Sequence, residues 1–147
     1  MIEISPIETD DFERLFRIEQ AAHSVPWSMG TLLNNQGDNY LNLKLLKHEK
    51  IVGFAICQTV LDEATLFNIA IDPAYQQQGL GEALLLQLIE ALKQRAVLTL
   101  WLEVRLSNLP AQKLYDRLGF NLVTQRKNYY PAENNKREDA LIMALYL

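Results

Sequence analysis

The middle of the chain restricts the fold more than any other part. A run typical of a β-strand, Ala64–Ile71, ends at Asp72-Pro73 and leads through a glycine-bearing loop into a strongly amphipathic helix, Gly81–Arg95. A dense apolar strand, Val97–Val104, follows at once. Two strands joined by a helical crossover pair in parallel, because only a long connection returns the chain in the same direction. The sequence therefore predicts a strand–helix–strand unit with parallel strands.

The segments on either side complete a mixed pattern. We expect strands at Met1–Ser5, Tyr40–Leu46, Ile51–Leu61, Phe120–Gln125 and Ala140–Leu147, and helices at Thr9–Ala22, Ser28–Asn35 and Asn108–Leu118. The strands that precede the crossover follow one another as a meander, which favours antiparallel pairing. The prediction is an α/β (α+β) fold. It has a single mixed, mostly antiparallel sheet with parallel strands at its centre and helices on both faces.

Length and composition narrow the class of protein. The 147 residues, 49% of them hydrophobic, suit one domain that spans residues 1–147. No apolar run reaches the ~20 residues that cross a membrane, and the N-terminus lacks a signal-peptide pattern. Cys57 is the only cysteine, which indicates a core residue in a reducing, cytoplasmic location. The net charge of -4 argues against nucleic acid as the main ligand, and two histidines with one cysteine poorly supply a metal site.

The loop that opens the amphipathic helix is the first candidate site. It reads Gln76-Gln77-Gln78-Gly79-Leu80-Gly81, followed by Glu82. Unpaired N–H groups at a helix start attract anions, and glycines let a phosphate approach the backbone closely. A plain strand-to-helix turn needs glycine as well, so the loop alone leaves both interpretations open. A P-loop would require Gly-Lys-Ser/Thr, and the glycine spacing differs from a dinucleotide-binding fingerprint.

Two motifs in order resemble the GNAT acetyltransferase superfamily. Gln76–Gly81 is similar to its Gln/Arg-x-x-Gly-x-Gly/Ala motif, with Gln77 where relatives often carry Arg. Asn108–Tyr115, followed by Leu118-Gly119-Phe120, is similar to its second signature. The similarity to one bacterial subfamily, the ribosomal-protein-alanine N-acetyltransferases, covers essentially the whole chain. It includes Trp27-Ser28, Leu61–Ala70, Leu100–Arg105 and Asn128–Pro131.

The resemblance implies acetyl-CoA as co-substrate and the N-terminal alanine of a small-subunit ribosomal protein as acceptor. It also implies that the central parallel strands splay apart, which we expect to happen after Ala70. The pantetheine arm of the cofactor would then pair with exposed strand backbone, and its pyrophosphate would lie on the loop. The implied cofactor-binding residues are Ile69, Ala70, Ile71, Gln76, Gln77, Gln78, Gly79, Leu80, Gly81, Glu82 and Asn108.

Glu103 is the candidate base. It interrupts a largely apolar strand and, by strand alternation, shares a face with Trp101 and Arg105. Partial burial there would raise the pKa of the carboxyl. The alternatives are an ion pair with Arg105 and simple exposure to solvent. The resemblance implies that Glu103 accepts the proton of the attacking amine.

Tyr115 is the candidate acid. It lies almost two helical turns after Asn108, so both side chains face the same way. The alternatives are that Asn108 only caps the helix and that Tyr115 is a core aromatic. The resemblance implies that Tyr115 protonates the leaving coenzyme A thiolate in a direct transfer within a ternary complex.

The acceptor side is less defined by the sequence. Aromatic residues fall in predicted loops where a peptide could lie, although packing roles fit equally: Trp27, Tyr129 and Tyr130, with Pro131 beside them. Glu138-Asp139 could attract a cationic N-terminus or cap a strand, and His23 and His48 are predicted surface or loop residues. Other amines as acceptors and a non-catalytic acetyl-CoA-binding module remain alternatives. The presence of both Glu103 and Tyr115 argues against the module.

Overall fold

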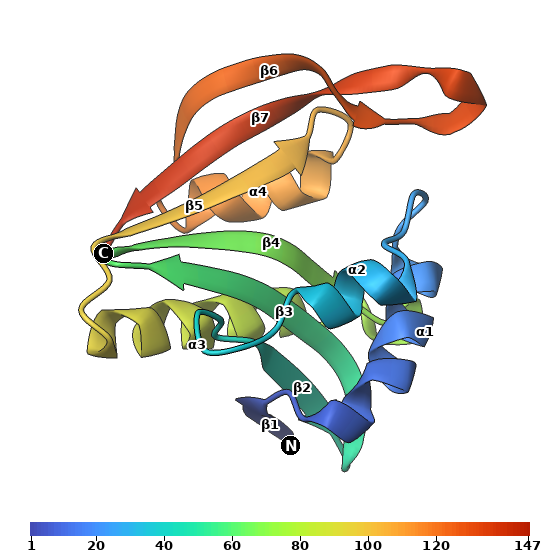
Figure 1. Ribbon diagram of the computed structural model, residues 1–147, viewed down its shortest axis with the longest axis vertical. Helices are drawn as coiled ribbons and strands as arrows, with labels where there is room; N and C mark the ends of the chain where they lie inside the picture. Colours follow the sequence, from blue (N-terminus) through green and yellow to red (C-terminus); the bar gives the residue numbers. More distant parts are fainter.

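A seven-stranded sheet runs through the middle of the molecule, as the computed structural model of residues 1–147 shows (Figure 1). Its strands are β1 (Ile2–Pro6), β2 (Leu43–Lys47), β3 (Lys50–Val60), β4 (Glu63–Ile71), β5 (Thr99–Arg105), β6 (Asn121–Pro131) and β7 (Arg137–Tyr146), in the spatial order β1-β2-β3-β4-β5-β7-β6. All neighbours pair antiparallel except β4 and β5, which are parallel. The predicted mixed sheet with a central parallel pair is confirmed.

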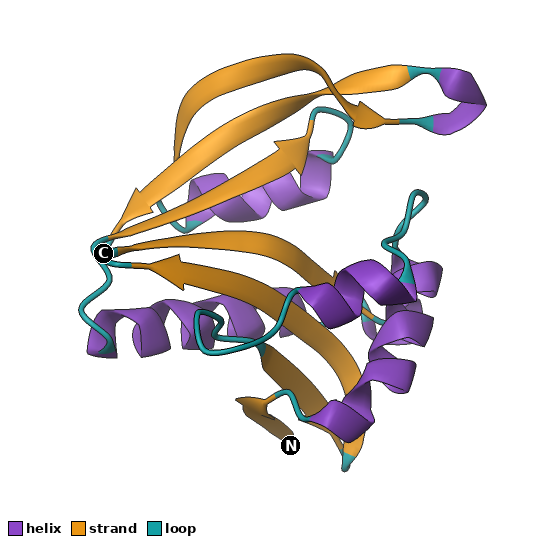
Figure 2. Ribbon diagram, viewed as in Figure 1, coloured by secondary structure: helices purple, strands orange, loops and turns teal.

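Helices cover both faces of this sheet, as predicted (Figure 2). They are α1 (Phe12–Ala22), α2 (Met29–Asn34), α3 (Leu80–Gln94) and α4 (Leu109–Arg117), with short 3-10 turns at Thr9–Asp11, Pro73–Tyr75 and Glu133–Asn135. One core cluster joins the leucines of α3 and Tyr115 of α4 to one face of the sheet. A smaller cluster joins α1 and α2 to the other face. No helix of the structure is long and apolar enough to span a membrane.

Side chains of β5 point alternately to the two faces of the sheet, and this alternation decides which of them are buried. Leu100, Leu102 and Val104 are buried in the core shared with α3, and each contributes about 1.5–3 kcal/mol by leaving water. The residues between them, including Glu103, are only half-buried on the opposite face. On that side of the sheet, α1 packs mainly on β3 and β4 and leaves this face of β5 largely uncovered. Polar side chains can therefore remain on it.

The largest boundary differences lie in the polar parts of the sheet. β2 begins at Leu43 rather than at Tyr40, because the side chain of Asn42 replaces strand pairing: its Oδ1 accepts from Cys57 N at 3.0 Å. β6 continues to Pro131 rather than ending at Gln125, and β7 begins at Arg137 rather than at Ala140. The side chains of Asn121 to Asn128 are all exposed, so this edge strand lacks the apolar alternation that would predict its length.

The parallel pair separates halfway along its length. Pairing runs from Glu63 opposite Thr99 to Leu66 opposite Leu102 and then stops. At the same point Phe67 has no partner on β3 and forms a β-bulge. A bulge bends its strand and increases the twist, so β4 follows β3 while β5 continues beside β7 (Figure 1). The predicted splay is present, but it begins at Phe67 and not after Ala70.

Candidate active site

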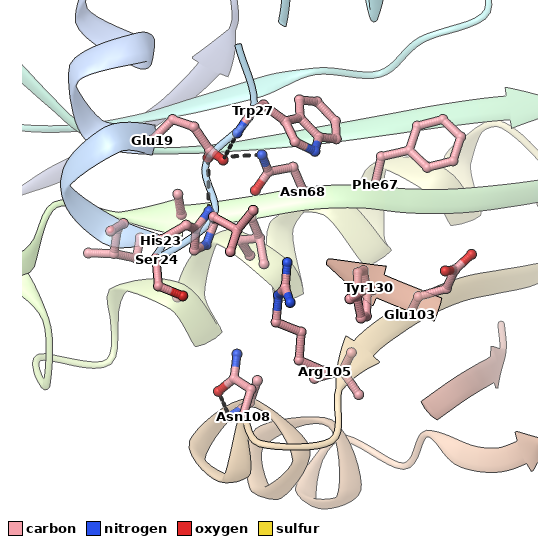
Figure 3. Close-up of a pocket in the computed structure, with 18 of the residues that line it drawn as sticks. Glu19, His23, Ser24, Trp27, Phe67, Asn68, Glu103, Arg105, Asn108 and Tyr130 are labelled. Atoms are coloured by element: carbon pink, nitrogen blue, oxygen red, sulfur yellow. Dashed lines mark hydrogen bonds and ion pairs between the residues drawn. The ribbon is translucent and has the colours of Figure 1, made fainter. Parts of the chain in front are cut away.

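A cavity of about 510 Å³ occupies the space where β4 and β5 diverge. Its walls are β4 from Phe67 to Ile71, the end of β5 from Glu103 to Arg105, the start of α4, and the segment that follows α1 (Figure 3). Elements far apart in the sequence thus meet around one space. Glu103, Asn108 and Tyr115, which the sequence singled out, all line it.

The free edge of β4 forms one wall. Asp72 N donates to Val52 O on β3 at 2.7 Å, and backbone groups in a strand point to alternate sides. The backbone of Ala70 therefore faces β3, while Ile69 and Ile71 direct theirs toward the space that β5 has left. The carbonyl of Ile71 accepts from Gln76 Nε2 at 2.9 Å. The backbone of Ile69 and the N–H of Ile71 can offer strand-like hydrogen bonds to a ligand. Ala70 lines the cavity with its backbone turned toward β3, and its contact with the cofactor stays a prediction.

The loop before α3 presents a row of free backbone donors. The N–H groups from Gln77 to Glu82 make no hydrogen bond within the chain, and Gly79 caps the helix with a positive φ of 77°. Gln77 also has a positive φ, 62°. Consecutive free N–H groups at the positive end of a helix dipole form a concavity for an anion. Gly81 lines the cavity, so this cradle is continuous with it.

The side chains of the loop already have partners in the protein. Gln78 Oε1 accepts from Lys47 Nζ at 2.6 Å, and Glu82 pairs with Arg117. Leu80 is buried in the core, whereas Gln77 is exposed. An anion on this loop would meet mainly backbone, with the charge of Lys47 nearby. Lys47 comes from β2, and no motif near it in the sequence signalled this contact.

Glu103 carries a carboxylate that forms no ion pair. It lies beside Tyr130 at the rim of the cavity (Figure 3), and the Tyr129 hydroxyl is a hydrogen-bonding neighbour of its carboxylate. Arg105 donates instead to Glu138 Oε1 at 2.9 Å, so the alternative ion pair between Glu103 and Arg105 is wrong. The pKa of the Tyr129 hydroxyl is raised, first by burial and then by the Glu103 carboxylate close to it. Glu103 is thus available to accept a proton from a ligand.

Tyr115 and Asn108 combine structural roles with access to the cavity. Tyr115 is buried and packs on Phe120 with ring centroids 5.5 Å apart, as a core aromatic would. Its hydroxyl makes no hydrogen bond within the protein. Every fully buried polar side-chain atom does have a partner, so the hydroxyl is not fully buried and is accessible from the cavity. Asn108 is the predicted N-cap and accepts from Ala111 N at 3.2 Å, which leaves its amide nitrogen free.

The sequence reasoning missed Glu19, a cavity residue that is only 1% exposed. Its carboxylate binds His23 Nδ1, Trp27 N and Asn68 Nδ2, each at 2.9 Å (Figure 3). It thereby fixes the segment after α1 against β4, next to the bulge. His23 lies in the loop after α1, as predicted, and it also lines the cavity. The available signal was a carboxylate on the apolar face of the predicted helix.

The residues proposed for acceptor contacts are only partly brought together. Trp27 and Tyr130 line the cavity, while Tyr129 packs edge-on against Tyr130 at 5.1 Å. Glu138 and Asp139 are engaged in contacts within the protein rather than free to attract a cation. No group of three or more His, Cys, Asp and Glu side chains is arranged to hold a metal ion.

The comparisons define the class of protein. The family model described as "Acetyltransferase (GNAT) family" matches residues 3–120. The chain belongs to this family and is an acyltransferase.

Individual relatives carry names that specify the acceptor of the acetyl group. The ribosomal protein bS18-alanine N-acetyltransferase of Haemophilus ducreyi is 64% identical, over 98% of this chain and 99% of its own length. The crystal structure of the ribosomal-protein-S18-alanine N-acetyltransferase from Escherichia coli has a TM-score of 0.96 and 57% identity, covering 99% of this chain and 94% of that one. Arabidopsis thaliana NAA60 in complex with acetyl-CoA, at 18% identity and a TM-score of 0.88, covering 100% of this chain and 99% of that one, shares the fold.

Substitution of Glu19 tests its role in the site. Glu19→Ala leaves the Asn68 amide and the Trp27 N–H without their acceptor, so we expect the free energy of unfolding to fall by about 2–3 kcal/mol in urea titrations. Glu13→Ala is the control, because its exposed pair with Arg17 contributes at most about 1 kcal/mol.

The same variant has a pH signature. Burial raises the pKa of Glu19, but His23, Trp27 N–H and Asn68 outweigh it and hold the pKa below the ordinary 4.5. A carboxylate whose pKa is lower in the folded state stabilises the fold at pH values above its unfolded-state pKa. This stabilisation is lost as the pH falls through the folded-state pKa. The stability gap between wild type and Glu19→Ala should therefore narrow below pH 4.5. A gap that stays constant on acidification would contradict this account.

Proposed function

We propose that this protein transfers the acetyl group of acetyl-CoA to the N-terminal alanine α-amine of the small-subunit ribosomal protein bS18. The observation that carries the proposal is one cavity lined by Glu103, by Tyr115 and by the edge of β4 that lacks a strand partner. The near full-length identity of 64% to an enzyme named for this reaction supports the choice of acceptor.

The chain offers groups that fit each part of acetyl-CoA. The free N–H groups from Gln77 to Glu82 suit the pyrophosphate, and the backbone of Ile69 and Ile71 suits the amides of the pantetheine arm. The unused amide nitrogen of Asn108 supplies a further donor at the cavity wall. Bound acetyl-CoA would supply a thioester acyl group and a thiolate as leaving group.

Glu103 would accept the proton that the amine loses when it attacks. An α-amine has a pKa of about 7.7–8.0 and a lysine amine about 10.4, so the α-amine reaches its neutral form far more readily near neutral pH. A single carboxylate can therefore assist an N-terminal amine where lysine would demand a stronger base. This difference favours an N-terminal acceptor over a lysine side chain.

Tyr115 would return a proton to the leaving thiolate. Burial raises its pKa to about 12, so the hydroxyl stays protonated at neutral pH and can act as a donor. Transfer is direct, since the one thiol is unsuited to carry the acyl group. Cys57 is fully buried outside the cavity, and burial raises its pKa to about 12.

Removal of the base should slow turnover and change its pH profile. For Glu103→Gln we expect kcat to fall by about 10²-fold or more, with the remaining rate rising only as the α-amine itself deprotonates. Coenzyme A affinity, measured by calorimetry, should stay near that of wild type. Glu63→Gln is the matched control, because Glu63 lies outside the cavity and only accepts from Trp101 Nε1. Wild-type turnover of Glu103→Gln from about pH 6 to 9 would exclude Glu103 as the base.

Removal of the acid should slow transfer without loss of the fold. Tyr115→Phe keeps the packing on Phe120 and deletes a hydroxyl that has no partner in the chain. We expect kcat to fall by about 10²-fold, with an unfolding midpoint within error of wild type. Tyr146→Phe, at a largely exposed ring, serves as the control. A wild-type kcat for Tyr115→Phe would remove Tyr115 from the mechanism.

A peptide panel tests the acceptor directly. Peptides with the bS18 N-terminal sequence are incubated with acetyl-CoA, with the first residue varied and with the α-amine free or blocked. We expect acetylation of the free alanine peptide and none of the blocked peptide, read by mass spectrometry. Transfer to lysine in the blocked peptide would favour a side-chain acceptor. Tight cofactor binding with no transfer to any peptide would favour a non-catalytic binding module.

A further inference from the structure

The β6–β7 hairpin contains a large irregularity beside the cavity. Arg126 pairs with Ala140 and Tyr130 pairs with Glu138, so the three residues from Lys127 to Tyr129 stand opposite Asp139 alone. Figure 1 shows β6 arching away from β7 before the two strands meet again toward the hairpin tip. Asn128, in the middle of this bulge, has a positive φ of 52°. Backbone groups here lack strand partners and need others.

Two charged side chains of β7 supply these partners. Asp139 Oδ1 accepts from Asn128 N at 2.9 Å, and its Oδ2 accepts from Gln125 Nε2 at 2.7 Å. Arg137 donates through Nε to Asn128 O at 2.8 Å and through Nη2 to Tyr129 O at 2.7 Å. Because alternate residues of a strand face the same side, Arg137 and Asp139 hold the bulge together. The Asn128 N–H, followed by Gln125, also holds the pKa of Asp139 below its usual value.

The bulge leads directly to the tyrosines of the cavity wall. Tyr130 lines the cavity and stacks on the Arg105 guanidinium, 4.4 Å from its ring centroid, while Arg126 stacks on Tyr129 at 4.3 Å. Glu138, between the two clamping residues, binds Arg105 Nη1 at 2.9 Å and Ser107 N at 3.2 Å. Three consecutive residues of β7 thus fix this wall of the cavity: Arg137 and Asp139 bind the β6 bulge, and Glu138 binds Arg105 and Ser107.

We propose that Arg137 and Asp139 are positioning residues that set the acceptor-binding wall by clamping the β6 bulge. Neither side chain lines the cavity, so they act through the placement of Tyr129 and Tyr130. The inference rests on the proposed acetyl transfer. The cofactor cradle lies on β4 and on the loop before α3, and neither Arg137 nor Asp139 hydrogen-bonds to it.

The test separates acceptor binding from cofactor binding. For Asp139→Ala and Arg137→Ala we expect the KM for the alanine peptide to rise about tenfold, with kcat and the Kd for coenzyme A within about twofold of wild type. Asp139→Asn keeps an oxygen for Asn128 N–H, so most of the acceptor affinity should return. Lys136→Ala removes a neighbouring exposed charge that makes no side-chain contact, and it should leave the KM unchanged.

A double variant adds a second readout. Both side chains hold the same bulge, so Arg137→Ala with Asp139→Ala should raise the KM little more than either change alone. Should Asp139→Ala fail to fold, Arg137→Ala carries the test, because the carbonyls it releases are exposed and can bind water. An unchanged KM in Arg137→Ala, or an equal loss of coenzyme A affinity, overturns the clamp. Wild-type protein that leaves the alanine peptide unmodified overturns the proposed function itself.

Discussion

The parallel pairing of β4 with β5 ends at Leu66 and Leu102, beside the bulge at Phe67, and the site depends on that ending. A continuous ladder would have consumed the backbone groups of Ile69 and Ile71 and left no space between the strands. Where the strands separate, polar backbone remains without a strand partner and a cavity opens beside it. The same divergence leaves Glu103 on a free face and gives the Tyr115 hydroxyl access to the opening.

The two sides of the cavity are held by different forces. On the cofactor side, the loop is anchored by α3, whose leucines, such as Leu84 and Leu88, are completely buried. Burial of this kind makes a rigid support, since protein cores are close-packed. On the side proposed to bind the acceptor, Glu19, Arg137 and Asp139 hold polar segments through hydrogen bonds to backbone and side chains. Within the β6–β7 hairpin only β7 places residues in the core, and no residue of β6 is buried.

Sequence periodicity predicted the crossover, the helices on both faces and most strand bounds, because those segments bury one face and carry its period. Sequence periodicity did not predict the bounds of segments that bury no face. No residue at the end of β6 or at the start of β7 is fully buried, so no apolar alternation marked these segments as strands. The spacing of α1 places Glu19 on the apolar face of the helix, but it does not show which groups bind the carboxylate there. Its partners, Trp27 and Asn68, lie 8 and 49 residues away.

By itself the sequence determined the mixed sheet, the glycine loop before α3, the N-cap at Asn108, and Glu103 with Tyr115 as candidates for the chemistry. These are local properties: period, turn residues and motifs are written in consecutive residues. Only the tertiary structure decided where the parallel strands part, that the backbone of Ala70 faces β3, and that Arg105 binds Glu138 rather than Glu103. Each of these depends on the register between strands, and register arises from the packing of segments that are distant in the chain.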